Sequence, residues 1–105
     1  MKSFKQMLKE YYFGQTEDPR TPIEKNADQH VYDMVEMDQK FRSENPTTRT
    51  FPLEYDGNAL TAIRNYYLAV KDPKNHPQHV QNMKSYMDLI KRSLPHLSNH
   101  IHPKY

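Results

Sequence analysis

The sequence predicts an all-α protein: one helical domain over residues 1–105, built from four main amphipathic helices and a docked C-terminal segment. Two observations support this prediction. In four separate stretches, apolar residues recur every three or four positions, which is the period of a helix with one buried face. The chain also contains only two Gly, whereas the hairpin turns of a β protein require Gly or Asn.

The first helix is predicted from about Phe4 to Tyr12, with Ser3 as its N-cap. Its apolar residues share one face: Phe4, Met7, Leu8, Tyr11 and Tyr12. The stretch "FGQTEDPR" that follows breaks the helical period. We therefore expect a connection there before the next helix.

The second helix has the clearest start signal. In "TPIE", Thr21 is placed as N-cap, Pro22 as first helical residue and Glu24 as partner in a capping box. The helix is expected to end near residues 42–44, because the residue before Pro46 avoids helical backbone. Its apolar stripe is Ile23, Ala27, His30, Val31, Met34, Met37 and Phe41. Four acidic residues are expected to be solvated around its surface: Asp28, Asp33, Glu36 and Asp38.

A loop is predicted for "NPTTRTFPLEYDG", because its Pro and Thr residues disfavour a helix. Phe51 and Leu53 are expected to pin this loop to the core. Asp56 or Asn58 is placed to cap a third helix that ends near Lys71. The apolar stripe of that helix is Ala59, Leu60, Ala62, Ile63, Tyr66, Tyr67 and Val70.

The fourth helix follows the turn "DPKNHP". Asn75 or His76 is placed to cap it, with Pro77 as the first helical residue. One face of this helix carries Val80, Met83, Met87, Ile90 and Leu94. Pro95 removes one helical donor and is expected either to kink the chain or to restart it as a short new turn.

The last residues, "RSLPHLSNHIHPKY", contain three His within seven positions. Leu97 and Ile101 continue the apolar stripe, so the segment is expected to dock on the domain. The chain has no Cys and no H-E-x-x-H motif, so surface His is a better interpretation than a metal site. His30 differs because it lies within an apolar stripe, where burial is expected to lower its pKa.

Composition excludes several classes of protein. Without Cys there is no disulfide framework and no thiol nucleophile. With 35% hydrophobic residues and no long apolar run, the chain is expected to be soluble and cytoplasmic, without a membrane segment. It carries no nucleophile elbow, P-loop, kinase or deaminase signature. We therefore predict no enzymatic activity and no cofactor.

Charge is unevenly distributed along the chain. Residues 1–70 hold nine basic and eleven acidic side chains, whereas residues 71–105 hold six basic and two acidic ones. A basic stretch is typical of polyanion binding, because Lys and Arg neutralise phosphates. The strip that would contact nucleic acid is Lys71, Lys74, Lys84, Lys91 and Arg92. Asp88 interrupts this strip, and an ordinary solvated face explains the same pattern.

Three residues lie opposite the apolar stripes of their helices and are the candidates for protein binding: Tyr32, Leu68 and Leu89. Exposed aromatic and aliphatic side chains mark interface cores where they cluster. Scattered singly, they carry no such meaning. Whether these three cluster depends on packing, which the sequence leaves open.

The N-terminal "MKSFKQML" followed by a Tyr pair, and Phe51-Pro52 before "ALTAIRNYYL", resemble the YozE-like family of small bacterial proteins. The resemblance implies an all-α, SAM-like fold without a known enzymatic role. Two features depart from the family: "TTRTFP" lacks the acidic residue before Phe-Pro, and the second helix and its following loop are longer. Small helical proteins of this kind are common in phages and mobile elements of Gram-positive bacteria.

These observations favour a non-enzymatic module that binds a macromolecule. The leading hypothesis is a protein partner, with the chain as an adaptor or a phage-type inhibitor of a host enzyme. The alternative is a DNA-associated accessory or regulatory protein that uses the basic strip. A histidine–metal protein is the third hypothesis.

Overall fold

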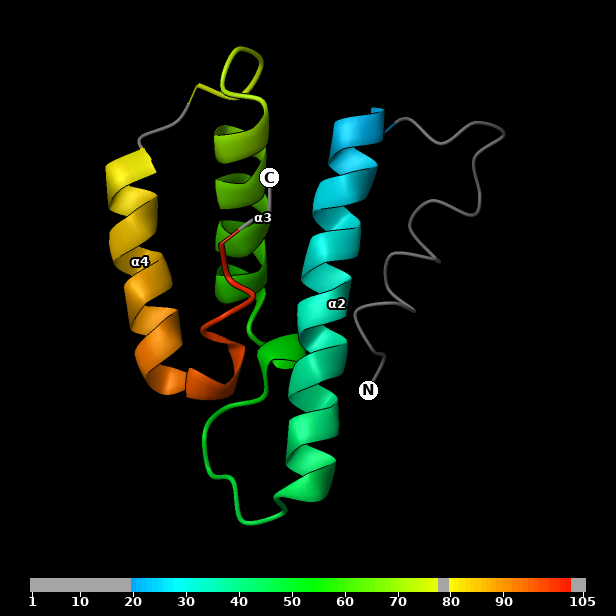
Figure 1. Ribbon diagram of the computed structural model, residues 1–105, viewed down its shortest axis with the longest axis vertical. Helices are drawn as coiled ribbons and strands as arrows, with labels where there is room; N and C mark the ends of the chain where they lie inside the picture. Colours follow the sequence, from blue (N-terminus) through cyan, green and yellow to red (C-terminus); the bar gives the residue numbers. More distant parts are fainter. Residues whose placement is uncertain (1–19, 78–79, 103–105) are drawn as a thin grey trace.

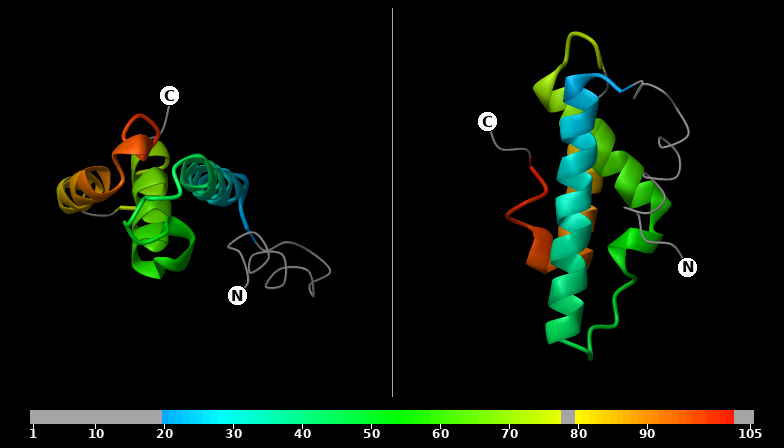
Figure 2. Two further views of the ribbon diagram at one scale, coloured as in Figure 1. Left: turned by 90° about the horizontal axis from the view of Figure 1, so that it is seen from below. Right: turned by 90° about the vertical axis from the view of Figure 1, so that its right-hand side faces the viewer.

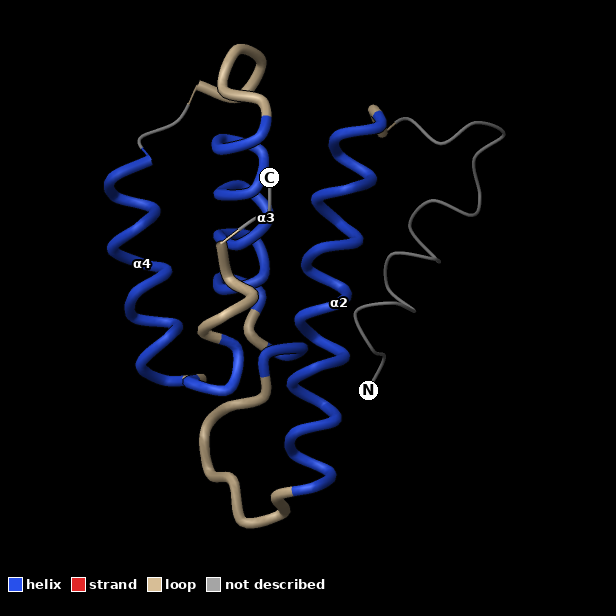
Figure 3. The backbone as a smooth tube through the Cα atoms, in the orientation of Figure 1, coloured by secondary structure: helices blue, strands red, loops and turns tan. Residues whose placement is uncertain are grey.

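The structure, a computed structural model, describes residues 20–77 and 80–102. Its elements are α2 (Pro22–Glu44), η1 (Leu53–Tyr55), α3 (Gly57–Lys71), α4 (Val80–Ser93) and η2 (Pro95–Leu97), where η marks a 3-10 turn. The described residues contain helices and loops but no strand (Figure 3). The all-α class is therefore confirmed, whereas the helix predicted over residues 4–12 lies outside the described residues.

Helix α3 lies between the other two helices and contacts both (Figure 1). α2 and α4 run antiparallel to α3 on its two sides (Figures 1 and 2). The C-terminal segment, residues 95–102, crosses α3 on one face of this layer, and its turn η2 contacts both α2 and α4. The segment thus joins two helices that flank α3 on opposite sides.

The start of α2 is the capping box that the sequence predicts. The hydroxyl of Thr21 accepts from the backbone N–H of Glu24, and the Glu24 carboxylate accepts from the backbone N–H of Thr21. The hydrogen bond from the Thr21 backbone lowers the pKa of Glu24. Pro22 occupies the first helical position, and the helix ends at Glu44, as predicted.

The third and fourth helices differ in how well their starts match the expectation. Asp56 caps α3, with its carboxylate accepting from the backbone N–H of Ala59 at 3.1 Å. The predicted first residue of the fourth helix, Pro77, instead lies in a loop. The side chain of Asn75 donates to the carboxylate of Asp72, and the backbone N–H of His76 donates to the Asp72 carbonyl. These two residues therefore close a turn on Asp72.

The core is continuous across all three helices and the C-terminal segment. Leu97 and Ile101 are fully buried in it, so the prediction of a docked segment is confirmed, as is the new turn at Pro95. The buried cluster comprises Val31, Met34, Val35, Leu53, Ala59, Leu60, Ile63, Tyr66, Met87, Ile90, Leu94, Leu97 and Ile101. None of the helices in the described part of the chain combines the length and apolar character that a membrane span needs.

Three expectations about burial were wrong. Leu53 pins the loop to the core, but the side chain of Phe51 is 63% exposed. Asp28 and Asp38 are buried, where the sequence predicts solvated carboxylates. Basic side chains make their burial possible, because a buried carboxylate is tolerated only when it is paired and hydrogen-bonded. Leu68, expected on the surface, is also buried.

Candidate functional site: an apolar groove beside α4

An apolar hollow of about 310 Å³ lies between the loop before η1, the start of α3 and the second half of α4. Phe51 from the loop and Leu89 from α4 both line it. They are among the large apolar residues that the described chain exposes, at 63% and 52%. The remaining lining residues are Thr50, Asp56, Ala59, Tyr86, Ile90, Ser93 and Leu94.

A second hollow of about 390 Å³ lies farther along the same two helices and shares Tyr86 with the first. Its apolar surface comes from Ala62 and Met83, and its polar surface from three Asn and a Thr. The residues that line it are Asn58, Thr61, Ala62, Asn65, Asn82, Met83 and Tyr86. We call the two hollows together the groove.

The groove is almost free of charge. Among its lining residues only Asp56 carries a charge at neutral pH. The carboxylate of Asp56 is already used as the cap of α3. A partner that brought a charged side chain into this surface would lose hydration without gaining a counter-ion. The groove therefore suits an apolar and uncharged contact.

Arg42 at the end of α2 fixes the loop that presents Phe51. Its guanidinium donates to the carbonyl of Thr50 at 2.5 Å, to the hydroxyl of Thr50 at 2.9 Å and to the carbonyl of Phe51 at 3.0 Å. Nε of Arg42 donates at 2.9 Å to the carboxylate of Asp38. The backbone beneath Phe51 is thus held in one place although its side chain is in solvent.

Asp38 is the buried centre of this support. Its Oδ2 accepts from Arg42 and from the backbone N–H of Leu53 at 3.0 Å, and its Oδ1 lies 2.6 Å from Nε2 of His96. The ring of His96 stacks on Phe41, with centroids 3.9 Å apart. Burial raises the pKa of Asp38, but the hydrogen bonds from Arg42, Leu53 and His96 outweigh it, so the pKa is lowered. One carboxylate thus ties α2 to the loop and to the C-terminal segment.

The three residues predicted to bind protein do not lie together. Leu89 is exposed on α4, as expected, and lines the groove. Tyr32 is half-buried on α2, and its hydroxyl donates to Glu36. Leu68 is 2% exposed, so its prediction as a surface residue was wrong. The sequence missed Phe51 as the true neighbour of Leu89, because the two are brought together only by packing.

The five residues of the predicted basic strip come from α3, from the turn after it and from α4. Lys84 and Lys91 lie seven residues apart on one side of α4, where both lower the pKa of His102. Arg92 is the next residue after Lys91, about 100° around the helix, and so faces elsewhere. Lys71 ends α3 near His30, and Lys74 is exposed in the following turn.

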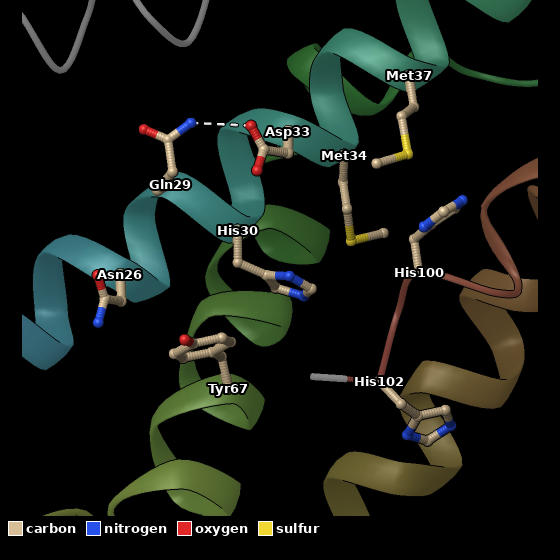
Figure 4. A pocket seen from close by; sticks show the side chains of 9 residues that line it. All are labelled: Asn26, Gln29, His30, Asp33, Met34, Met37, Tyr67, His100 and His102. Carbon is tan, nitrogen blue, oxygen red and sulfur yellow. Dashed lines mark hydrogen bonds between the residues drawn. The ribbon is translucent and has the colours of Figure 1, made fainter. Parts of the chain in front are cut away.

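A third hollow, of about 400 Å³, lies on the side of the molecule that carries the C-terminal segment. His30 of α2 and Tyr67 of α3 border it, with ring centroids 5.1 Å apart, and His100 and His102 of the segment lie across from them (Figure 4). Within residues 20–77 and 80–102, no three His, Asp or Glu side chains are grouped so as to hold a metal ion.

The groove is thus a loop-supported apolar surface, and the histidine-lined hollow lies beside a docked chain end. Comparison with known proteins found no family model, no curated protein and no solved structure that matches this chain.

Proposed function

We propose that this protein is a non-enzymatic protein-binding module and that its groove takes up an apolar segment of the partner. The observation that supports the proposal is that Phe51 and Leu89, from separate elements, expose their side chains over one hollow. Burying each of these side chains would contribute about 1.5–3 kcal/mol, which the protein does not gain while they are in water. A clustered pair of this kind is typical of the centre of an interface.

The rigidity of the loop strengthens the proposal. Arg42 and Asp38 hold the backbone at residues 50–51, so this backbone does not need to be ordered when a partner binds. Fixing the backbone of one residue costs about 1–2 kcal/mol. A residue that is both exposed and fixed in place avoids the backbone part of such a cost.

The partner segment that fits best is an amphipathic α-helix with an uncharged face. The two hollows follow one another between the antiparallel helices α3 and α4, and they share Tyr86. Apolar side chains one or two turns apart on a helix would occupy the two hollows, as in helix-in-groove recognition. Asn58, Asn65 and Asn82 offer hydrogen bonds without charge at the rim.

Such binding would make the protein an adaptor or a phage-type inhibitor of the bound protein. The proposal keeps the four helices that the sequence predicts, the first of which lies outside the described residues, and the SAM-like fold that the family resemblance implies. It also keeps the expectation of a protein without enzymatic activity.

The test is a pull-down from native host lysate with the full chain, followed by binding of the purified partner to variants. Phe51→Asp and Leu89→Asp place a charge in the groove and should each weaken binding at least about tenfold. Gln81→Asp adds the same charge to an exposed position of α4 that does not line the groove, and should bind normally. A partner that both groove variants retain at wild-type affinity contradicts the proposal.

The DNA-binding alternative has a separate test. It predicts a gel shift at low salt that disappears as salt rises and weakens when Lys84 and Lys91 are both changed to Glu. A salt-dependent shift of this kind, together with no partner captured from lysate, would replace the protein-binding proposal. Lys84 and Lys91 lie near His102 and do not line the groove, so the uncharged change Leu89→Ala should leave any gel shift unchanged.

A further inference from the structure

We propose that the C-terminal segment is an acid-released latch: it covers the core between α2 and α4 at neutral pH, and residues 97–102 lift away when His30 and His102 take up protons. Leu97 and Ile101 of this segment are fully buried, so its departure would uncover a large part of the core. The latch lies on the other side of α4 from the groove and does not depend on the proposed function.

The hydrogen bonds of His102 require a neutral ring. Its Nε2 lies 2.9 Å from Nζ of Lys91, and its Nδ1 lies 2.7 Å from the hydroxyl of Tyr66. Because an ammonium group can only donate, Nε2 must accept, which leaves the single ring proton on Nδ1. A second proton on Nε2 would point at Lys91 and replace the hydrogen bond with a repulsion between two cations.

The charged groups around His102 mostly oppose its protonation. Burial lowers its pKa first, Lys91 and Lys84 of α4 lower it further, and Asp88 of the same helix acts in the opposite direction. From α3, the group in contact is the uncharged hydroxyl of Tyr66. His102 is itself exposed, so water screens these interactions and its contribution is the smaller one.

His30 provides the larger contribution from beneath the segment. Its Nε2 is buried and makes no hydrogen bond, so the charge that a second ring proton brings would be poorly solvated. Burial is the main reason why the pKa of His30 is lowered. His100 of the segment and Lys71 of α3 lower it further, whereas the backbone of Ile101 and the carboxylate of Asp33 act in the opposite direction.

The direction of the pH effect follows from these two rings. In the closed state their pKa values lie below the ordinary value of 6.5, so the closed state binds fewer protons than a state in which water reaches the rings. Acid therefore favours the open state as the pH falls below 6.5. Residues 98–102 lie outside the described helices and 3-10 turns, so they can leave the core without breaking a helix.

The start of the segment behaves differently and forms the pivot. His96 can donate from Nε2 to Asp38 whether its ring is neutral or protonated. The lowered pKa of Asp38 keeps this carboxylate charged to below 3.8. Between pH 6.5 and 3.8 the contact of His96 with α2 should thus persist while residues 97–102 leave.

The experiment is an NMR titration of the full chain, labelled with ¹⁵N, from pH 7.5 downward. The amides of Leu97, Ser98 and Ile101 should lose their native shifts and high heteronuclear NOE values below pH 6.5, while those of Val31 and Ile63 keep high NOE values. Far-ultraviolet circular dichroism should stay constant over the same range. If the segment stays docked to pH 4, or if the helices lose structure together with it, the proposal is overturned.

Variants test whether His30 and His102 cause the release of the segment. His30→Leu with His102→Gln removes both titrating rings and should keep the segment docked throughout the range. The control is His76→Gln, which removes a ring that lies 3.9 Å from Asp72 in the turn after α3. In this variant the segment should be released over the same pH range as in the wild type. Each variant is checked for folding by its helical circular dichroism and by its native shifts at pH 7.5. A release that is unchanged in His102→Gln alone and in the double variant overturns the assignment.

Discussion

The carboxylate of Asp38 is buried and hydrogen-bonded, and its contribution to stability therefore depends on pH. Its side chain is 1% exposed and accepts hydrogen bonds from two basic residues and one backbone N–H. The folded state lowers its pKa, so it contributes stability above the unfolded value near 3.8. That contribution disappears as the pH falls through the folded pKa, because both states are then protonated.

This linkage predicts the behaviour of Asp38→Asn, which removes the charge with little change in shape. At pH 7 the variant should unfold about 2–3 kcal/mol more easily than the wild type, because three donors lose a charged acceptor. The difference should shrink toward zero below pH 3.8, where the wild type loses its own carboxylate. Urea unfolding at a series of pH values measures the loss of stability at pH 7 and its decrease at low pH.

The matched control is Asp33→Asn, an exposed position on the same helix whose carboxylate accepts from Gln29. It should change the free energy of unfolding by no more than about 0.5 kcal/mol. If the loss in Asp38→Asn were equal at pH 7 and pH 3, the ionised carboxylate would not be its source.

At the scale of elements, α2 is the helix whose start the sequence encodes most completely. Thr21, Pro22 and Glu24 act within four residues of one another, so their hydrogen bonds need no other part of the chain. The start of α4 is different, because Asn75 and His76 could cap a helix but bond to Asp72 instead. Local signals predict a helix end only where no neighbouring group competes for the same donors.

Thr21→Ala tests the local contribution. It removes one half of the capping box and should lower the free energy of unfolding by about 1 kcal/mol. Thr47→Ala in the exposed loop after α2 is the control and should stay within about 0.5 kcal/mol of the wild type. Thermal or urea unfolding gives both values. Equal effects in the two variants would show that the box adds nothing to stability.

At the scale of the whole molecule, the C-terminal segment completes the core. η2 contacts both α2 and α4, and Ile101 is 0% exposed, so the segment closes one face of the layer around α3. Leu89 of α4 faces outward at 52% exposure, although it is an aliphatic residue of similar size. The stability of the fold should therefore depend on the chain end more than on this exposed helix position.

Substitution to Ala measures that difference. Ile101→Ala should cost about 2–4 kcal/mol, because it removes a fully buried side chain and leaves a cavity. Leu89→Ala should change stability by no more than about 0.5 kcal/mol. Urea unfolding at pH 7.5, where the latch is closed, compares the two. If Ile101→Ala lowered the free energy of unfolding by less than 1 kcal/mol, the segment would not contribute to the stability of the core as expected.

Much of the site could not be predicted from the sequence. Leu89 and Phe51 lie 38 positions apart, and no periodicity relates a loop residue to the outer face of a helix. Phe51 was expected to pin the loop to the core, whereas the backbone held by Arg42 leaves its side chain in solvent. Asp38 and Arg42 are spaced four residues apart, which is the one local signal of their pairing.

The sequence by itself determined the all-α class, the capped start and end of α2, the course of α3 and the docking of Leu97 and Ile101. Each of these follows from helical periodicity or from hydrogen bonds between residues close in the chain. The tertiary structure decided which carboxylates are buried, whether Leu68 is buried or exposed, and which apolar side chains meet at the groove. These depend on contacts between distant residues, because packing alone determines which faces of the helices are left in water.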